Sequence, residues 1–491
     1  MSQRLARKAG SAFFWKGFQL TGNKLIFLVR TIILARILAP EDFGLMAIAL
    51  VAVSFLTGIT NLGMVPALVQ SNHVDERTYD TAWTIGMIRA IAITVIVFVA
   101  APWIATAFAE PRATELIKVI AIRPVLNAAS SIKVAKITRE LRFRSITVLN
   151  LADALVNTIL SIAMAPNLGV WALIGGTLAG QCATLGLSYV IAPHHPQILF
   201  DREALKSLVN FGQWIFFTGV IAVGGNSLLQ LVISRSLGVA ELGLYSLATK
   251  LAFLPYEISS EVIGSVAFPL YSRLQSDLKQ AARVFRSLLA GMWAIIVPIC
   301  LLLIALTPVI VNEILGPKWG GTAPVIRLLA LVNVITLLSD SISPILNGVG
   351  LPQKTTIIEA CQYMLLISLI WGFTRRFGVS GAALAWLISG SFSQWISLLF
   401  LKQIIPEPLA GLFKPFSLVA LTSAFGAVLA LGIAYILPGL MGLILASLAA
   451  STVIILLLWF GDRALQLSLG KDFSSAFPQF VALLRIPLSE S

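Results

Sequence analysis

Apolar positions along the chain come in long blocks and lack the strict alternation of half-buried strands. Short polar or proline-bearing segments such as 193–205 (PHHPQILFDREAL) separate the blocks. Each block is long enough to cross the hydrocarbon core of a bilayer as an α-helix, which takes about 20 residues. Because lipid offers no partner to backbone groups, such blocks should be helical. The pattern predicts about fourteen membrane-spanning helices, at residues 11–37, 43–70, 80–106, 116–138, 145–166, 169–192, 206–235, 242–270, 284–313, 322–348, 355–377, 380–402, 413–437 and 440–461.

Composition excludes a water-soluble globule. Hydrophobic residues make 58% of the 491 residues and charged residues only 12%, with a mean hydropathy of +0.91, whereas a soluble domain has about 25% charged residues. Most of the 35 Lys and Arg residues fall in loops and span ends that lie on the same side of the membrane, with clusters in 133–144 and 273–286. The positive-inside rule then predicts an all-α, multi-pass protein of the bacterial inner membrane with both termini cytoplasmic. The net charge of +13 therefore reflects topology and attraction to anionic lipid, and no nucleic-acid partner is expected.

The chain contains an internal repeat. Residues 34–49 (LARILAPEDFGLMAIA) and 233–248 (ISRSLGVAELGLYSLA) align at one constant offset, which pairs Gly44 with Gly243. The two copies lie six predicted spans apart, so both enter the membrane from the same side. This spacing predicts two pseudo-symmetric six-helix lobes in a parallel repeat. The expected organisation is an N-terminal lobe (1–192), a cytoplasmic linker (193–205), a C-terminal lobe (206–402), two additional spans (403–461) and a cytoplasmic tail (462–491).

Polar residues recur at helical spacing inside the spans, where ionisable groups are costly and mark pathways or binding sites. In the first span Gln19, Asn23 and Arg30 share one face, and Lys24 lies beside them. Deep cations outnumber acids in the first lobe, which favours an anionic cargo. Guanidinium groups match phosphate oxygens, and their amide neighbours suit sugar hydroxyls. The candidate binding residues are Gln19, Asn23, Lys24, Arg30, Asn61, Arg89, Arg123, Asn127, Asn226 and Lys250.

Acidic residues within the spans are candidates for coupling transport to a proton or sodium gradient. These candidates are Glu257, Glu261, Asp340 and Glu359. The competing interpretation for single residues is an ion pair that holds two helices together, as for Lys250 with Glu257 or Glu261.

Signals of enzyme chemistry are lacking in the sequence. No phosphate-cradling loop with Lys-Ser/Thr occurs, and no Ser/His/Asp constellation stands out. The three histidines, His73, His194 and His195, lie in loops, and no third ligand is near to complete a site, so no metal site is expected. Three cysteines lie within spans as small packing residues, at Cys182, Cys300 and Cys361. We therefore expect a transporter without a cofactor, driven at most by an ion gradient.

Four segments carry a family resemblance. They are 34–49 (quoted above), 244–259 (LYSLATKLAFLPYEIS), 268–277 (FPLYSRLQSD) and 316–331 (GPKWGGTAPVIRLLAL). With the fourteen-span layout, the chain resembles the Wzx-type polysaccharide flippases of the multidrug/oligosaccharidyl-lipid/polysaccharide exporter superfamily. The resemblance implies two lobes around a V-shaped central cavity with a cationic lumen.

The resemblance also implies a cargo, a polyprenyl-pyrophosphate-linked oligosaccharide moved from the inner to the outer leaflet by alternating access for lipopolysaccharide or exopolysaccharide synthesis. Lys24 and Arg30 occupy the region whose cations contact the pyrophosphate in relatives. Lys250 stands where many relatives carry Arg, and Asn226 lies in a span where an acid is common. Expected partners are the lipid-linked glycan, membrane lipids, a polysaccharide polymerase and other export components. The alternatives are a peptidoglycan lipid-precursor flippase, a cation-coupled multidrug exporter and a noncatalytic scaffold for glycan-assembly enzymes.

Overall fold

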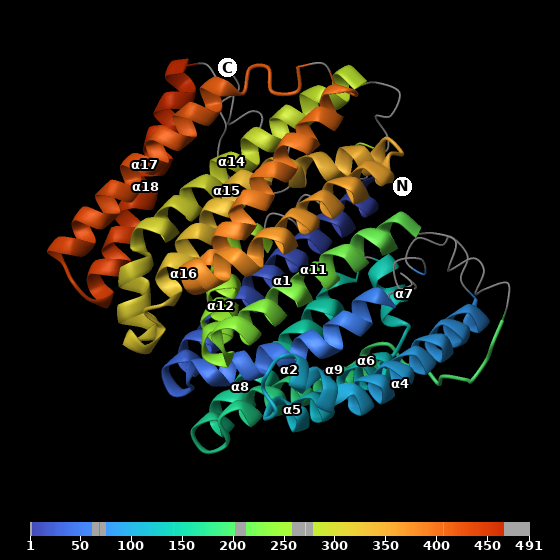
Figure 1. The fold of residues 1–491 in the computed structure, drawn as a ribbon. Coiled ribbons are helices and arrows are strands. Elements are labelled where there is room, and N and C mark those ends of the chain that lie inside the picture. The colour runs from blue at the N-terminus through green and yellow to red at the C-terminus, as the bar shows by residue number, and fades with distance from the viewer. Residues whose placement is uncertain are drawn as a thin grey trace. The chain divides into compact units, whose positions relative to one another are not determined.

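The computed structural model describes residues 2–60, 68, 75–140, 142–201, 213–257, 271, 278–405 and 407–465, and these residues contain helices and no strand (Figure 1). The chain divides into two compact units, Met1–Gly243 and Leu244–Ser491. Ten of the described helices are long and apolar enough to cross a membrane. The protein is thus a multi-pass, all-α membrane protein.

The first unit is built from nine complete helices and the start of a tenth among the described residues. They are α1 (Ser2–Ile37), α2 (Pro40–Ile59), α4 (Glu76–Ala107), α5 (Ala113–Ile120), α6 (Arg123–Ala129), α7 (Val134–Arg139), α8 (Phe143–Leu168), α9 (Val170–Ile191) and α11 (Gln213–Leu237), with the first turn of α12 (Val239–Ala252). The unit extends beyond the predicted linker at 193–205 because α11 packs against α2, where Gly58 faces Val223.

The second unit holds the remaining turns of α12 and the C-terminal helices. These are α14 (Leu278–Val309), the π-helical η1 (Ile310–Leu315), the short η2 (Pro317–Trp319), α15 (Thr322–Gly348), α16 (Pro352–Lys402), α17 (Phe413–Ile436) and α18 (Leu440–Leu465). Its core is a cluster of buried apolar side chains around Phe285, Leu289 and Leu346. The helices α17 and α18 pack on each other and on α14, and both expose many apolar side chains.

Helix boundaries in the second unit follow the hydropathy pattern closely. The predicted span 322–348 coincides with α15, and the predicted spans 413–437 and 440–461 correspond to α17 and α18. The helix α16 is 51 residues long, but Gly378 interrupts it with φ 60° and ψ −148°. This break lies between the predicted spans 355–377 and 380–402. Glycine is suited to this position because it adopts a positive φ without steric cost.

The expectation of one continuous helix at 116–138 is wrong, since the structure has α5, α6 and α7 there. Pro124 has no N–H to donate to the preceding turn, so the chain restarts as α6. Ser130 then adopts an extended conformation with φ −62° and ψ 153°, which separates α6 from α7. Within the predicted span 242–270, α12 stops at Ala252, residues 254–257 are helical again, and residues 258–270 lie outside the described residues. Residues 466–491 of the predicted tail lie outside them as well.

The two copies of the internal repeat touch at their glycines. A Cβ on Gly44 would lie 2.0 Å from the carbonyl oxygen of Val239, and a Cβ on Gly243 would lie 1.8 Å from that of Pro40. Pro40 and Val239 are themselves paired by the repeat offset, so the two contacts are related by pseudo-symmetry. The first turns of α2 and α12 therefore cross with backbone in contact with backbone, which explains why both copies carry glycine here.

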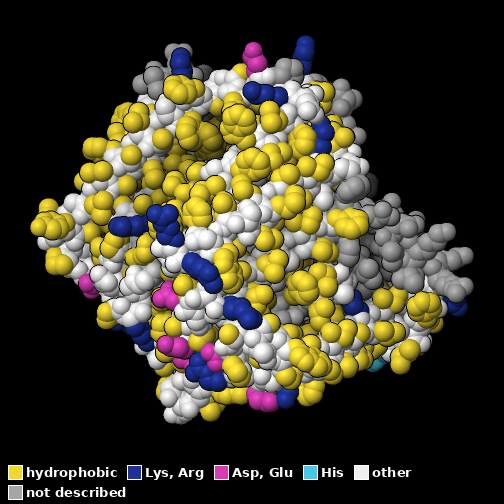
Figure 2. Space-filling model, in the orientation of Figure 1, with side chains coloured by type: hydrophobic (Ala, Val, Ile, Leu, Met, Phe, Trp, Pro, Cys, Tyr) yellow, Lys and Arg dark blue, Asp and Glu magenta, His cyan; other side chains and the backbone are white. Residues whose placement is uncertain are grey.

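Hydrophobic side chains cover most of the visible face of the molecule (Figure 2), as expected for helices that face lipid. Cations near helix ends lie over aromatic rings. The guanidinium of Arg463 is 3.9 Å from the Trp459 ring centroid, and that of Arg375 is 4.6 Å from the Trp371 centroid. Such amphipathic pairs are typical of the interface between lipid and water.

The glycine contact leads to a stability prediction. Gly243→Ala should lower the melting temperature of the detergent-solubilised protein, since overpacking a close contact costs about 1–3 kcal/mol. The matched control is Gly86→Ala in α4, where no atom lies within 4 Å of the added methyl group. Thermal unfolding followed by tryptophan fluorescence measures both. Equal melting temperatures for the two variants would contradict the assigned contact.

Candidate functional site

A cluster of three charges lies inside the first unit. Arg30 comes from α1, Arg123 begins α6, and Asp153 lies on α8. Asp153 interacts electrostatically with both arginines. No ion pair or hydrogen bond joins these three described side chains to one another. Two guanidinium groups therefore face one carboxylate without touching it, an arrangement that leaves a surplus of positive charge among apolar helices.

Close helix packing holds the carboxylate in place. The helix α8 packs against α1 and α9, and α6 packs against α9. A Cβ on Gly180 would lie 2.6 Å from Asp153 Oδ1, and a Cβ on Gly176 would lie 2.0 Å from Ser161 Oγ and 3.0 Å from Asn157 Oδ1. The glycines of α9 thus admit the polar stripe of α8 made by Asp153, Asn157 and Ser161. The small-residue spacing of α9 is a packing device that seats polar groups between two helices.

The polar face of α1 lies near the same helix. Gly22 of α1 faces Leu151 of α8, since an added Cβ would lie 3.1 Å from its Cδ2 atom. Gln19 is only 6% exposed. Gln19 Oε1 and Asn23 Oδ1 are both buried with no hydrogen-bond partner in the protein. Buried polar atoms are rarely left unsatisfied, so these two amides are suited to accept a hydrogen bond from water or from a bound molecule.

Other predicted binding residues lie elsewhere. Arg89 Nη1 donates to the carbonyl oxygen of Thr60 at 2.9 Å. A cation at the C-terminal end of α2 complements the helix dipole, so Arg89 has a structural role there. Asn127 and Asn226 are exposed, and the latter donates to the Ala222 carbonyl at 3.1 Å. The remaining predicted binding residues are Lys24, half-buried on α1, Lys250, half-buried on α12, and Asn61, which lies outside the described residues.

The second unit contains a cluster of the opposite charge. Tyr256 Oη donates to Asp340 Oδ1 at 3.5 Å, and Glu359 of α16 interacts electrostatically with both. Asp340 Oδ2 is buried and has no hydrogen-bond partner. Of the four predicted ion-coupling residues, Asp340 and Glu359 are therefore brought together. Glu257 is exposed, and Glu261 lies outside the described residues.

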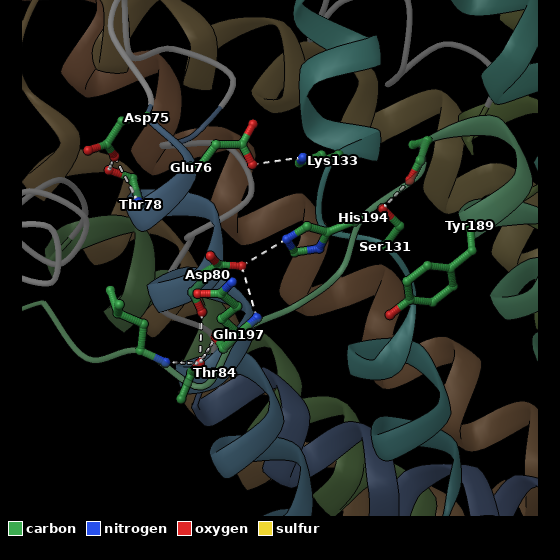
Figure 3. A network of polar contacts seen from close by, with 12 residues as sticks. Asp75, Glu76, Thr78, Asp80, Thr84, Ser131, Lys133, Tyr189, His194 and Gln197 are labelled. Atoms are coloured by element: carbon green, nitrogen blue, oxygen red, sulfur yellow. Dashed lines mark hydrogen bonds and ion pairs between the residues drawn. The ribbon is translucent and has the colours of Figure 1, made fainter.

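A third polar network, shown in Figure 3, ties the segment after α9 to the start of α4. His194 is 4% exposed, and its Nε2 lies 2.9 Å from Asp80 Oδ1. The same oxygen accepts a hydrogen bond from the Gln197 backbone N–H at 3.2 Å, and Thr84 Oγ1 accepts one from the Leu199 N–H. The sequence predicted that His194 lies in a loop, but it did not predict the contact with Asp80. A histidine next to a span carries no signal that identifies a buried partner far away in the chain. Among the described residues, no three potential ligands gather as a metal site.

Comparison with known proteins places the chain in a family. The model of the polysaccharide biosynthesis protein family matches residues 33–324, more than half of the chain. The chain belongs to this family. The chain is similar to the succinoglycan biosynthesis transport protein ExoT of Rhizobium meliloti. The two are 26% identical over 389 residues, which cover 77% of this chain and 74% of that one. The lipopolysaccharide biosynthesis protein WzxC of Escherichia coli is 24% identical over 365 residues, 74% of each chain.

Solved structures support the fold of this family member. The lipid II flippase MurJ in an inward closed conformation superposes with a TM-score of 0.71 at 15% identity, over 92% of this chain and 99% of that one. An inward-facing multidrug resistance MATE transporter gives a TM-score of 0.61 at 15% identity, over 78% and 94%. At such identities the likeness shows the helical fold and nothing about cargo.

The network of Figure 3 leads to a prediction about the chain after α9. His194→Ala should destabilise the docked segment 193–201, because losing a hydrogen bond to a charged group costs about 1.5–3 kcal/mol. Limited proteolysis should then cleave this segment faster. His195→Ala is the matched control, since the neighbouring histidine is exposed. Equal cleavage of the two variants would show that the bond to Asp80 does not hold the segment.

Proposed function

We propose that the protein is a flippase that moves a polyprenyl-pyrophosphate-linked oligosaccharide from the inner to the outer leaflet of the bacterial inner membrane. The observation that carries the proposal is the surplus of guanidinium groups around Asp153 in the first unit. Arg30 and Arg123 offer forked donors that match the oxygens of a diphosphate. The names of relatives, which include a succinoglycan transport protein and a lipopolysaccharide biosynthesis protein, support a glycan as cargo.

The physical problem of such transport is the polar head. A sugar chain cannot cross hydrocarbon unaided, whereas the polyprenyl tail need never leave it. The head therefore requires a polar path inside the protein, and the buried amides Gln19 and Asn23 on α1 are suited to sugar hydroxyls or bridging water. The tail can stay against apolar helices, and α17 and α18 expose such surfaces.

The proposed mechanism is alternating access between two lobes, residues 1–192 and 206–402, joined by the linker 193–205. Both termini lie in the cytoplasm in this proposal, in line with the distribution of Lys and Arg. A polysaccharide polymerase and other export components are the expected protein partners, because they would consume the cargo at the outer face. The proposed binding residues also include Lys24 of the first unit, and Lys250 of the second unit stays a candidate from the sequence.

Two other transport functions share the architecture. A peptidoglycan lipid-precursor flippase also needs cations that bind the diphosphate of its cargo. The likeness of this chain to MurJ is in the fold alone. A cation-coupled multidrug exporter should favour acidic groups in its binding site, which the cluster of Arg30 and Arg123 disfavours. A noncatalytic scaffold would need no buried charges. The polysaccharide reading is preferred because the sequence relatives are polysaccharide proteins.

The first test is transfer of a fluorescent polyprenyl-pyrophosphate oligosaccharide between leaflets of liposomes that contain the protein. Arg30→Ala should lower the affinity for the head group by about ten- to a hundredfold, because hydrogen bonds to charged groups contribute about 1.5–3 kcal/mol. Arg112→Ala is the control, as this cation lies exposed in a loop and pairs with Glu110. Unchanged transfer by Arg30→Ala would count against the site. No transfer of any polyprenyl-linked glycan by the folded native protein would overturn the function.

The acidic cluster of the second unit is proposed to couple transport to an ion gradient. In that case Asp340→Asn should remove the stimulation of transfer by an imposed proton or sodium gradient while transfer down a lipid gradient persists, because an amide cannot exchange a proton or balance a cation. Glu313→Gln is the control, because Glu313 is an exposed acid in η1. Gradient stimulation that survives in both Asp340→Asn and Glu359→Gln would exclude this pair.

A further inference from the structure

One acidic side chain in the first unit has no part in the function proposed so far. Asp153 is half-buried on α8, and Gly180 of α9 lies against its Oδ1 atom. It makes no hydrogen bond or ion pair with any described residue. A carboxylate held in a fixed position without a direct partner is costly inside apolar helices, so its place beside two guanidinium groups calls for an explanation.

The charges that face Asp153 come from several helices. The α1 helix brings Arg30, and also Lys24 on a neighbouring face; the start of α6 brings Arg123. The α9 helix, whose backbone lies against the carboxylate, carries no Asp, Glu, Lys, Arg or His, and its titratable groups are Cys182 and Tyr189. The short α7 helix, which ends just before α8 begins, carries Lys136 and Arg139, and Arg144 in the first turn of α8 lies over the Trp15 ring. Glu140, between α7 and α8, lies 3.9 Å from Arg142. Among the described groups, the two cations Arg30 and Arg123 and no second acid interact electrostatically with Asp153.

In the absence of cargo, the arginines favour the ionised form of the carboxylate, because opposite charges within several ångströms stabilise each other. A diphosphate diester bound between Arg30 and Arg123 would change this balance. It carries a negative charge on each phosphate, so it would neutralise the guanidinium groups and place like charge beside Asp153. Like charges disfavour the ionised form of a carboxyl group.

We propose that Asp153 takes up a proton when an anionic pyrophosphate head group binds between Arg30 and Arg123, so that the carboxylate serves as the internal counter-ion of the empty site. This inference rests on the proposed function, whose cargo supplies the head group. The proton comes from water and is bound by the Asp153 carboxylate; no other bond forms or breaks. The occupied site then carries less net charge than it would with an ionised carboxylate. Proton release from Asp153 would accompany release of the head group.

The test measures protons bound with the head group. The full-length protein in detergent is titrated by calorimetry with geranyl-pyrophosphoryl-N-acetylglucosamine, a diester whose phosphates do not titrate near neutral pH. Repeating the titration in buffers of different ionisation enthalpy gives the number of protons taken up per ligand. The native protein should take up about one proton, as linkage requires for a group that is ionised in the empty site and protonated in the occupied site.

Asp153→Asn should bind the same ligand with no proton uptake and at least as tightly, since the competing internal anion is gone. Glu115→Gln is the matched control, because this acid is exposed on α5 and pairs with Lys118 at the surface; it should behave as the native protein does. Native-like proton uptake by Asp153→Asn, or no uptake by the native protein, would overturn the proposal. A merely structural role for Asp153 would alter stability or affinity without changing the proton count.

A second measurement needs no variant, in case Asp153→Asn fails to fold. The native affinity for the same ligand should fall with rising pH, approaching tenfold per pH unit above the titration of the empty site, because binding takes up a proton. An affinity independent of pH would overturn the proposal. Transfer assayed in liposomes from the same preparation separates the two hypotheses: transfer without proton uptake on binding sinks only the role of Asp153. Proton-linked binding without transfer of any polyprenyl glycan sinks the flippase function.

Discussion

An ionised side chain inside a bilayer persists only where other charges or polar groups offset the loss of water. The first unit meets this constraint with one carboxylate and two guanidinium groups on three different helices, Asp153, Arg30 and Arg123. Because the groups interact without direct contact, the offset is partial and a surplus of positive charge remains. In a structural ion pair the opposite charges would be in direct contact and would balance each other. An open, cationic arrangement is suited to an anion that arrives and leaves.

The open arrangement depends on helices that cannot move apart or together freely. Glycines set the distances: Gly176 and Gly180 let the polar stripe of α8 lie against the α9 backbone, and Gly44 and Gly243 let the repeated helix starts cross. Hydrogen bonding adds a further restraint, since Asp80 holds the segment after α9 through His194. Packing of small residues is the main source of helix association in lipid, where the hydrophobic effect between helices is weak. The charge cluster therefore relies on residues that carry no charge.

Hydropathy was sufficient to predict the helical class and most spans, because the bilayer imposes one length and one pattern on every crossing. It failed at 116–138, where Pro124 and Ser130 interrupt the helix within an apolar stretch. Site prediction was less complete. Stripes of charge pointed to Arg30, but Asp153 is a single acid in its span and was not selected. Arg89 was predicted to bind cargo, and periodicity gave no sign of its hydrogen bond to the Thr60 carbonyl at the end of α2. Which charges meet depends on helix contacts that periodicity does not contain.

The two clusters differ in sign, and this difference separates their chemistry. The acidic pair Asp340 and Glu359 would repel the proposed anionic cargo, and Arg30 and Arg123 would repel a proton or metal cation, so each proposed ligand suits one of the two clusters. Asp340 of the second unit accepts a hydrogen bond from the phenol of Tyr256, whereas Asp153 of the first unit interacts with two cations. Neighbouring cations stabilise the ionised form of a carboxyl group, and this stabilisation is lost when a bound anion neutralises the cations. Asp153 is for that reason the acid whose protonation must respond to the cargo itself, while Asp340 and Glu359 respond chiefly to each other and to the cation they would bind.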